Sequence, residues 1–401
     1  MNTKNEKASK FPIAIWALTL GAFAIGMTEF VIMGLLPNVA EDLSVTIPQA
    51  GQLITGYALG VAVGAPILTT MTFKMPRKML LCILMAIFIA GNALAALSSS
   101  YSILMFARIV ASFAHGTFFG VGSIIAASLV RADKQASAVA VMFTGLTIAN
   151  ILGVPFGTFI GQQFGWRTTF WVITVLGIIS FFFIMLLVPS VQTTVQSSLR
   201  KEFQVFRKPQ VLIALLMTIF GFGGVFTAFT YIAPILEEIT GFSEHSVSLI
   251  LILFGVGVTI GNIVGGRLAD WRLMPSLIVN LAILAVIVAA FTLTDQVKPL
   301  AIITIFLWGI AAFGIVPGLQ VRIMNVAKDA PTLASTSNQS AFNIGNAGGA
   351  FLGGVTINGL GLFYVPLIAA FVTIIGLAIT MWSFSLDRQT KVAEQKKISI
   401  G

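Results

Sequence analysis

The chain has 401 residues, of which 57% are hydrophobic and only 9% are charged, with a formal net charge of +9. Because soluble proteins contain about 25% charged residues, this composition and a mean hydropathy of +0.98 exclude a water-soluble fold and predict an integral membrane protein. The apolar runs are continuous rather than alternating, which excludes a transmembrane β-barrel. The basic residues are dispersed, so they form no stripe for nucleic acid. The single cysteine, Cys82, excludes an intrachain disulfide and a cysteine-based metal cluster.

Twelve apolar runs are long enough to cross a bilayer, which takes about 20 residues per helix. In chain order they cover residues 12–37, 47–70, 79–97, 102–128, 136–161, 168–188, 211–236, 246–266, 276–293, 299–321, 333–359 and 362–385. They predict an all-α protein of twelve transmembrane helices. One polar, basic segment interrupts the series in the middle of the chain. We therefore expect a six-helix half over residues 1–188, a cytoplasmic linker over 189–210, and a second six-helix half with a tail over 211–401.

The basic residues also predict how the chain is oriented. Twenty of the 23 Lys and Arg residues fall on the side that carries both termini, whereas only Arg167 and Lys298 fall on the other side and Arg108 falls inside a span. Positively charged loops stay in the cytoplasm. We therefore expect a multi-pass protein of the cell (cytoplasmic) membrane with both termini cytoplasmic, and we expect a monomer.

The loop after the eighth span carries a recognisable signature. Its sequence GRLADWR contains Gly266, Asp270 and Arg272, and it resembles the G-x-x-x-D-[RK] loop signature of the major facilitator superfamily, with the base one place late. The corresponding loop after the second span keeps its basic end but has Thr69 and Phe73 where the signature has glycine and aspartate. The resemblance implies a gating role for the intact loop and not for the degenerate one.

The fifth span indicates which group within the superfamily the sequence resembles. Its sequence GLTIANILGVPFG, with Gly145, Gly153, Pro155 and Gly157, is similar to the glycine–proline motif of the superfamily's antiporters. GMTEF at 26–30 and HGTFFGVG at 115–122 resemble the arabinose-efflux-type branch of the drug:proton antiporters, which includes sugar, purine and chloramphenicol exporters. The resemblance implies the major facilitator fold, two six-helix halves around a site near the membrane midplane.

Three ionisable residues inside the spans are candidates for proton coupling, because a buried charge in a membrane is costly unless it is paired or hydrated. Glu29 is the only acid, Arg108 the only base and His115 the only histidine within the spans. The helical rise puts Glu29 about 12 Å and Arg108 about 9 Å from the outer surface, and His115 near the midplane. Arg108 and His115 share one helix face, so we expect a single polar cluster in the first half.

Each of these residues has an alternative interpretation. Glu29 either takes up and releases the coupling proton or forms a permanent ion pair with Arg108. Arg108 either keeps Glu29 ionised or locks two helices together. His115 either relays protons or hydrogen-bonds substrate, or it is a neutral side chain packed against glycines.

The second half offers uncharged candidates for substrate binding. They are Tyr231, Asn262, Gln320, Asn338, Gln339, Asn343 and Asn346, with Phe226 and Trp308 as aromatic walls. Gln339, Asn343 and Asn346 follow an i, i+4, i+7 spacing and share one face of a helix. Interhelical hydrogen bonding is the alternative role for these amides.

These observations favour a proton-coupled exporter of a small neutral or weakly charged amphipathic compound, such as a phenicol, a sugar derivative or a nucleoside. The proton is the coupling ion, and we expect no cofactor or metal. An uptake symporter or facilitator with the same fold is the alternative. An enzyme is not expected, since the connecting segments contain no evident nucleophile–base pair, metal cluster or phosphate loop.

Overall fold

The computed structural model describes residues 11–45, 47–72, 74–190 and 204–398. The helices of the first half are α1 (Ile13–Asp42), α2 (Ile47–Met71), α3 (Arg77–Ala96), α4 (Tyr101–Ser128), α5 (Gln135–Ile148), the π-helix η2 (Ala149–Gly153), α6 (Val154–Phe164) and α7 (Trp166–Leu187). Those of the second half are α9 (Pro209–Phe229), α10 (Ile232–Pro234), the π-helix η4 (Ile235–Ile239), α11 (Glu244–Thr294), α12 (Lys298–Gly314), α13 (Val316–Val326), α14 (Pro331–Gly359) and α15 (Val365–Ile398).

These helices make the predicted number of crossings. Ten stretches of the described residues are long and apolar enough to span a membrane. One of them lies in α11, which kinks at Arg272 (φ −150°, ψ 88°) and so crosses twice. α14 has 29 residues and is long enough as well, but its Asn, Gln, Ser and Thr side chains make it more polar than the others. With these two additions the described chain forms the twelve-helix fold that the sequence predicts.

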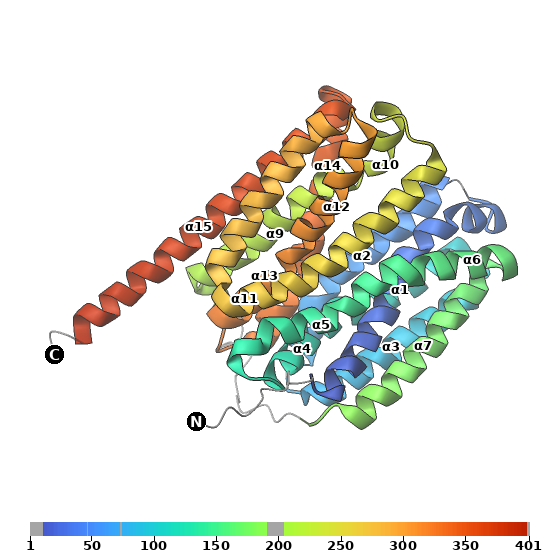
Figure 1. The fold of residues 1–401 in the computed structure, drawn as a ribbon. Helices are drawn as coiled ribbons and strands as arrows, with labels where there is room; N and C mark the ends of the chain where they lie inside the picture. Colours follow the sequence, from blue (N-terminus) through green and yellow to red (C-terminus); the bar gives the residue numbers. More distant parts are fainter. Residues whose placement is uncertain (1–10, 46, 73, 191–203, 399–401) are drawn as a thin grey trace, which may run out of the picture.

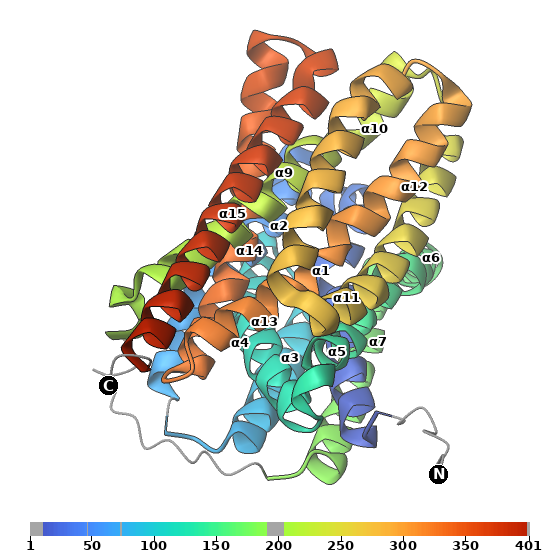
Figure 2. The same cartoon turned by 60° about the vertical axis from the view of Figure 1, so that its left-hand side comes forward.

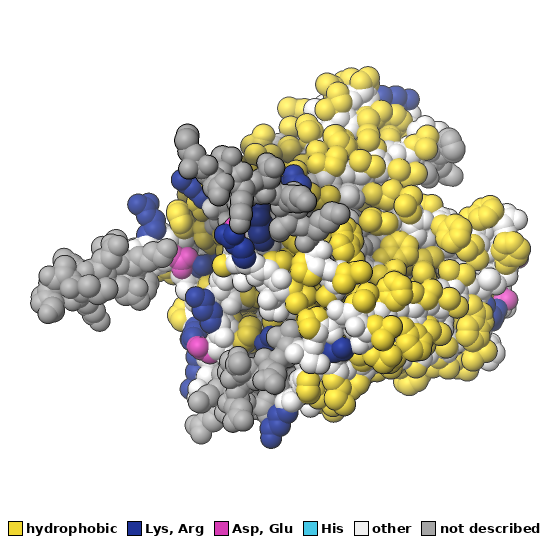
Figure 3. Space-filling view, turned by 60° about the horizontal axis from the view of Figure 1, so that its bottom comes forward, with side chains coloured by type: hydrophobic (Ala, Val, Ile, Leu, Met, Phe, Trp, Pro, Cys, Tyr) yellow, Lys and Arg dark blue, Asp and Glu magenta, His cyan; other side chains and the backbone are white. Residues whose placement is uncertain are grey.

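The helices form two adjoining bundles, α1–α7 and α9–α15, with both chain ends at the same end of the molecule (Figures 1 and 2). We call this end the terminal side and the opposite end the far side. α4 ends, α11 kinks and α14 begins on the terminal side. Dark-blue Lys and Arg side chains gather at the terminal side, whereas yellow apolar side chains cover the flanks (Figure 3). Residues 191–203 of the expected linker lie outside the described residues, so its boundaries stay a prediction.

Close glycine contacts set the distance between α1 and its neighbours. A Cβ on Gly145 would lie 2.0 Å from the carbonyl oxygen of Thr19, so α5 rests directly on the backbone of α1. A Cβ on Gly157 would lie 2.7 Å from Met27, and one on Gly153 would lie 3.3 Å from Phe23. The glycines of the predicted motif therefore all face α1, the helix that carries Glu29. Pro155 directly follows the π-helical turn η2, where the backbone hydrogen bonds already depart from the α-helical pattern.

Two helices end well beyond the expected spans, and one crossing has an irregular turn. α1 continues to Asp42 rather than ending at 37, and α15 continues to Ile398 rather than ending at 385. The fifth crossing is not uniform, because η2 inserts a π-helical turn between α5 and α6. Hydropathy reports where a chain leaves the hydrocarbon, whereas a helix ends where its backbone hydrogen bonds end, and this accounts for the two longer helices.

Candidate transport site and inter-half contacts

Four polar side chains from α1, α2 and α4 meet inside the first half. A carboxylate oxygen of Glu29 lies 3.8 Å from Nδ1 of His115. The hydroxyl of Tyr57 lies 3.3 Å from the same nitrogen, and the guanidinium of Arg108 stacks over the Tyr57 ring, 4.5 Å from its centroid. Tyr57, Arg108 and His115 are buried, and the Glu29 side chain is 18% exposed. The predicted cluster therefore forms, and Glu29 is its most accessible member.

The position of Glu29 along α1 explains its contact with His115. Since α1 ends at Asp42, Glu29 lies 13 residues from its end, or about 20 Å at the helical rise. The predicted depth of about 12 Å refers to the outer membrane surface and not to the end of the helix, so it stays a prediction. The 3.8 Å contact between the Glu29 carboxylate and Nδ1 of His115 shows that the two side chains lie at the same level.

Arg108 donates its hydrogen bonds to backbone carbonyls of α1 and not to the carboxylate of Glu29. Its guanidinium donates to the backbone carbonyl of Thr28 (2.6 Å) and, at 3.5 Å, to that of Glu29. Charge-assisted hydrogen bonds to carbonyls hold the cation in place, and the Tyr57 ring covers one face of the guanidinium. The interpretation of Arg108 as a lock between helices 1 and 4 therefore fits the geometry, whereas the permanent Glu29–Arg108 ion pair does not.

Three residues of this cluster were missed in the sequence. Tyr57 lines the site from α2, and Thr28 donates from its hydroxyl to Asn92 of α3 (2.9 Å). Asn92 in turn donates to the carbonyl of Phe88 (2.8 Å). Asn92 is the single amide of α3, whereas Thr28 and Tyr57 share their helices with several other polar residues. The sequence therefore contains no signal that separates these three from the other Thr, Tyr and Asn residues of the chain.

Asp270 joins the two halves at the terminal side. Its carboxylate accepts hydrogen bonds from the backbone N–H groups of Ala136 (2.7 Å) and Ser137 (2.9 Å), and from the Ser137 hydroxyl. These groups belong to the first turn of α5, where a negative charge is favoured by the unpaired N–H groups and the helix dipole. A Cβ on Gly266 would lie 2.6 Å from the Ala140 side chain, so this glycine permits the close approach. Arg272 stacks on Trp271, 5.1 Å from the ring centroid.

The corresponding contact after the second span, also on the terminal side, is built from threonine and serine hydroxyls and the Arg77 guanidinium. At the end of α2, the Thr69 hydroxyl donates to that of Thr336 in α14 (3.0 Å), and Arg77 donates to Thr332 at 3.5 Å. The Ser335 hydroxyl donates to the carbonyl of Gly120 in α4 (2.9 Å). Hydroxyl bonds thus join the halves where the sequence lacks the signature aspartate.

Asn262 also joins the halves rather than lining an open cavity. It is buried, and its amide donates to the carbonyl of Ala140 in α5 (2.7 Å). One turn away, the Thr259 hydroxyl donates to that of Thr147 (3.1 Å). The structure therefore brings Asn262 and Asp270 together along one seam between α5 and α11.

The predicted amides of the second half form a buried network. Gln320 of α13 accepts from Asn338 and Gln339 of α14 (2.9 Å each) and donates to Ser335. Asn338 also accepts from Thr218 of α9 (2.7 Å). Asn343 donates to the carbonyl of Gln339 within α14 (3.0 Å). Interhelical bonding thus engages most of these amides in this state.

The remaining candidates lie nearer the far side. The Tyr231 hydroxyl donates to the carbonyl of Ala350 (2.9 Å), whereas Oδ1 of Asn346 is buried without a partner among the described residues. Trp308 is fully buried, and its indole N–H is likewise unpartnered there. Phe226 and Trp308 each make edge-on contacts with Phe229. An aromatic wall therefore exists in the second half, and the indole N–H of Trp308 is an unused polar group within it.

A twelve-helix fold with a buried polar cluster and two contacting halves is typical of a membrane transporter. Sequence comparison identifies the transporter family. Residues 18–347 match the Major Facilitator Superfamily, and the chain belongs to this family of transporters, which are not enzymes. It is 46% identical to the inner membrane transport protein YdhP of Escherichia coli (strain K12), covering 95% of this chain and 97% of that protein. It is 38% identical to the putative transporter AraJ of the same organism (89% and 91% covered), which supports the arabinose-efflux-type branch.

Two further comparisons extend this assignment. A chloramphenicol resistance protein of Streptomyces lividans is 33% identical, covering 86% of this chain and 89% of that protein. Among solved structures, the major facilitator transporter FucP in the outward conformation superimposes with a TM-score of 0.76 at 16% identity, covering 93% of this chain and 99% of that one. At that identity the likeness concerns the fold alone.

Proposed function

We propose that the protein is a proton-coupled antiporter that exports a small neutral or weakly charged amphipathic compound by alternating access. The observation that carries the proposal is the environment of Glu29. Its carboxylate is partly accessible, contacts a histidine, and is not neutralised by the nearby Arg108. A group that must bind and release a proton requires access and a partner that can respond to its charge.

The state of the two halves supports alternating access. Asp270, Asn262, Thr69 and Ser335 join the halves towards the terminal side. If the terminal side is cytoplasmic, as the basic residues predict, this state is closed to the cytoplasm and faces outward.

A transport cycle follows from these contacts. In the outward-facing state a proton from outside neutralises Glu29, which weakens its attraction to His115 and the positive field of Arg108. Rocking of the halves then exposes the cluster to the cytoplasm, where Glu29 loses the proton and substrate binds. Exchange of one neutral substrate for one proton moves one positive charge inward, so both components of the proton motive force drive export.

The substrate class rests on the two walls of the site. The first half supplies one acid and one base, so no strong net field selects for cations. The second half supplies the aromatic wall around Phe229, with Asn346 and Trp308 as polar groups. A compound with an aromatic ring and a few hydroxyl or amide groups fits both. The similarity to a chloramphenicol resistance protein makes chloramphenicol a suitable probe.

Vesicle transport tests the proposal. We expect inverted membrane vesicles to accumulate chloramphenicol when an inward-acidic proton gradient is imposed, and Glu29→Gln to abolish the accumulation. Glu237→Gln removes an exposed acid elsewhere in the chain and serves as the matched control. Accumulation by right-side-out vesicles acidified on the outside would instead identify an uptake symporter, and gradient-driven accumulation by Glu29→Gln would overturn the role of Glu29.

A further inference from the structure

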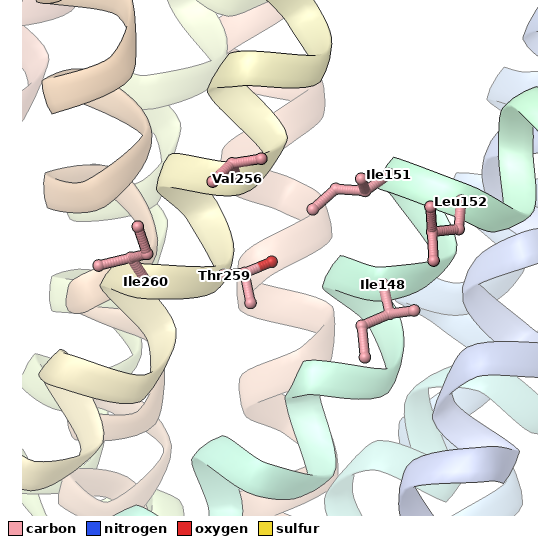
Figure 4. Close-up of a pocket in the computed structure, with 6 residues that line it drawn as sticks. All are labelled: Ile148, Ile151, Leu152, Val256, Thr259 and Ile260. Carbon is pink, nitrogen blue, oxygen red and sulfur yellow. The ribbon is translucent and has the colours of Figure 1, made fainter.

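A crevice opens on the membrane-facing side of the seam between the two halves. Ile148 of α5 and Ile151 and Leu152 of η2 face Val256, Thr259 and Ile260 of α11 across it (Figure 4). Its volume is about 250 Å³. Leu152 is 64% exposed, whereas Val256 and Ile260 are each 38% exposed. The transport cluster of the first half uses none of these residues.

The π-helix η2 shapes one wall of the crevice. Ile151 and Leu152 lie within this turn, which inserts an extra residue into the fifth crossing. Ile151 points towards α11 (Figure 4), where a Cβ on Gly255 would lie 2.7 Å from its side chain. Ile151 thus fits against a glycine and leaves space beside it. π-Helical turns of this kind often mark functional positions.

The crevice walls are apolar, so they favour a hydrocarbon ligand and offer no free hydrogen-bonding group to a polar one. Five of the six lining side chains are aliphatic. The sixth, Thr259, uses its hydroxyl internally, on Thr147 (3.1 Å) and on the carbonyl of Gly255 (3.2 Å). An open apolar crevice forfeits dispersion contacts along its walls unless an apolar group fills it.

The depth of the crevice identifies what reaches it. Ile148 lies 13 residues from the start of α5, and Val256 lies 12 residues from the start of α11. Both distances correspond to about 20 Å of helix, which is near the middle of a hydrocarbon core about 30 Å thick. The molecules present at that depth are lipid acyl chains.

The crevice belongs to the state that is closed at the terminal side. The contacts next to it on that side, Thr147 with Thr259 and Asn262 with Ala140, join α5 to α11. When the halves rock apart at the terminal side these bonds break and the two walls separate. A ligand of the crevice therefore binds one state better than the other, and such a ligand shifts the equilibrium towards the state it prefers.

We propose that the crevice between η2 and α11 binds one acyl chain of a membrane lipid while the terminal side is closed, and that its occupancy stabilises this closed state. The inference is independent of the transported substrate and of Glu29. It predicts a discrete, saturable lipid site on a surface that is otherwise covered by exchanging lipid.

Photo-crosslinking in detergent tests the proposal. The purified protein is titrated with a phosphatidylcholine that carries a diazirine in one acyl chain, and crosslinked residues are mapped by mass spectrometry. We expect saturable crosslinking at residues 148–152 and 256–260 that unmodified phosphatidylcholine competes away. Val256→Phe fills the crevice and should reduce this crosslinking at least about tenfold. Val286→Phe, the same change at a 68% exposed position of the same helix, should leave it unchanged.

Two further measurements complete the test. Ile260→Phe repeats the filling from a second position if Val256→Phe does not fold. Asp270→Asn, which loosens the terminal side, should lower crosslinking in the crevice without changing it around residue 286. Crosslinking that rises linearly with lipid and equally at the crevice and at residue 286, or that survives both filling variants, would overturn the proposal.

Discussion

At the scale of single residues, the site depends on which groups accept hydrogen bonds from the Arg108 guanidinium. The sequence places one acid in the first span and one base in the fourth, and an ion pair between them is the simplest expectation. The guanidinium instead binds the carbonyls of Thr28 and Glu29 and stacks on Tyr57. Its charge therefore contributes to the field at Glu29 without occupying the carboxylate. Sequence spacing cannot predict this, because it does not include the backbone carbonyls as competing acceptors.

A second residue-scale feature is the carboxylate of Asp295, which lies just beyond the end of α11 on the far side. Both of its oxygens are buried and lack a hydrogen-bond partner among the described residues. Burial raises the pKa of this carboxyl from 3.8 to about 6. A raised pKa in the folded state means that the protonated form is favoured there. The folded state therefore loses stability as the pH rises from about 4 to about 6.

We expect Asp295→Asn to remove this penalty. At pH 7.5 the variant should unfold at a temperature about 2 °C higher than the wild type, which corresponds to about 1 kcal/mol after solvent screening. The difference should vanish near pH 3, below the ordinary carboxyl pKa of 3.8, where the wild-type carboxyl is protonated in both states. Thermal unfolding of the detergent-purified proteins at the two pH values measures it, with Glu237→Gln as the control. A variant that is less stable at pH 7.5 would show that Asp295 has a charged partner.

At the scale of elements, the contact between Asp270 and α5 holds the terminal side closed. Its three hydrogen bonds to Ala136 and Ser137 are charge-assisted, and each bond of this kind contributes about 1.5–3 kcal/mol. The Thr69–Thr336 contact is neutral and contributes about 1 kcal/mol, and Arg77 adds one longer bond, 3.5 Å, to Thr332. The loop that keeps the aspartate therefore makes more and shorter charge-assisted hydrogen bonds than the loop that lacks it.

Asp270→Asn should therefore shift the protein away from the closed terminal side. Spin labels at Lys134 and Arg267, both exposed, on a Cys82→Ser background would report the separation of the halves. We expect one short distance in the wild type, and a broader, longer distribution together with reduced transport in Asp270→Asn. Thr69→Ala should change the distribution much less. Equal effects of the two substitutions would contradict the assigned asymmetry.

At the scale of the whole molecule, composition and motifs predicted the twelve-helix fold and the transporter family. The motif residues of the fifth and eighth crossings make the contacts that their residue types favour. Gly145 packs against the backbone of α1, and the Asp270 carboxylate accepts from the first turn of α5. Sequence reasoning assigned Gln320 and Asn338 to substrate binding or to helix contacts, and the structure places them in a bonded network. Gln320 and Asn338 are 18 residues apart in the sequence and meet because α13 packs against α14. The periodicity of the sequence does not specify this packing.

The orientation of the molecule in the membrane stays a prediction. Labelling of single cysteines with a membrane-impermeant maleimide in intact cells tests this orientation. In a Cys82→Ser background, the cysteines replace Glu41 or Asp42 on the far side, and Lys134 or Arg388 on the terminal side. Only the far-side positions should react before the cells are broken. Labelling of position 134 or 388 in intact cells would reverse the assignment and with it the outward-facing state.

The central claim is that substrate and proton are linked through Glu29. Linkage requires that binding of one changes the binding of the other by the same free energy. Calorimetric titration of the purified protein with chloramphenicol, in two buffers of different ionisation enthalpy at one pH, counts the protons released. We expect the wild type to release protons on binding, and Glu29→Gln to bind chloramphenicol and release none. Equal proton release by Glu29→Gln would contradict the account and transfer the coupling role to His115.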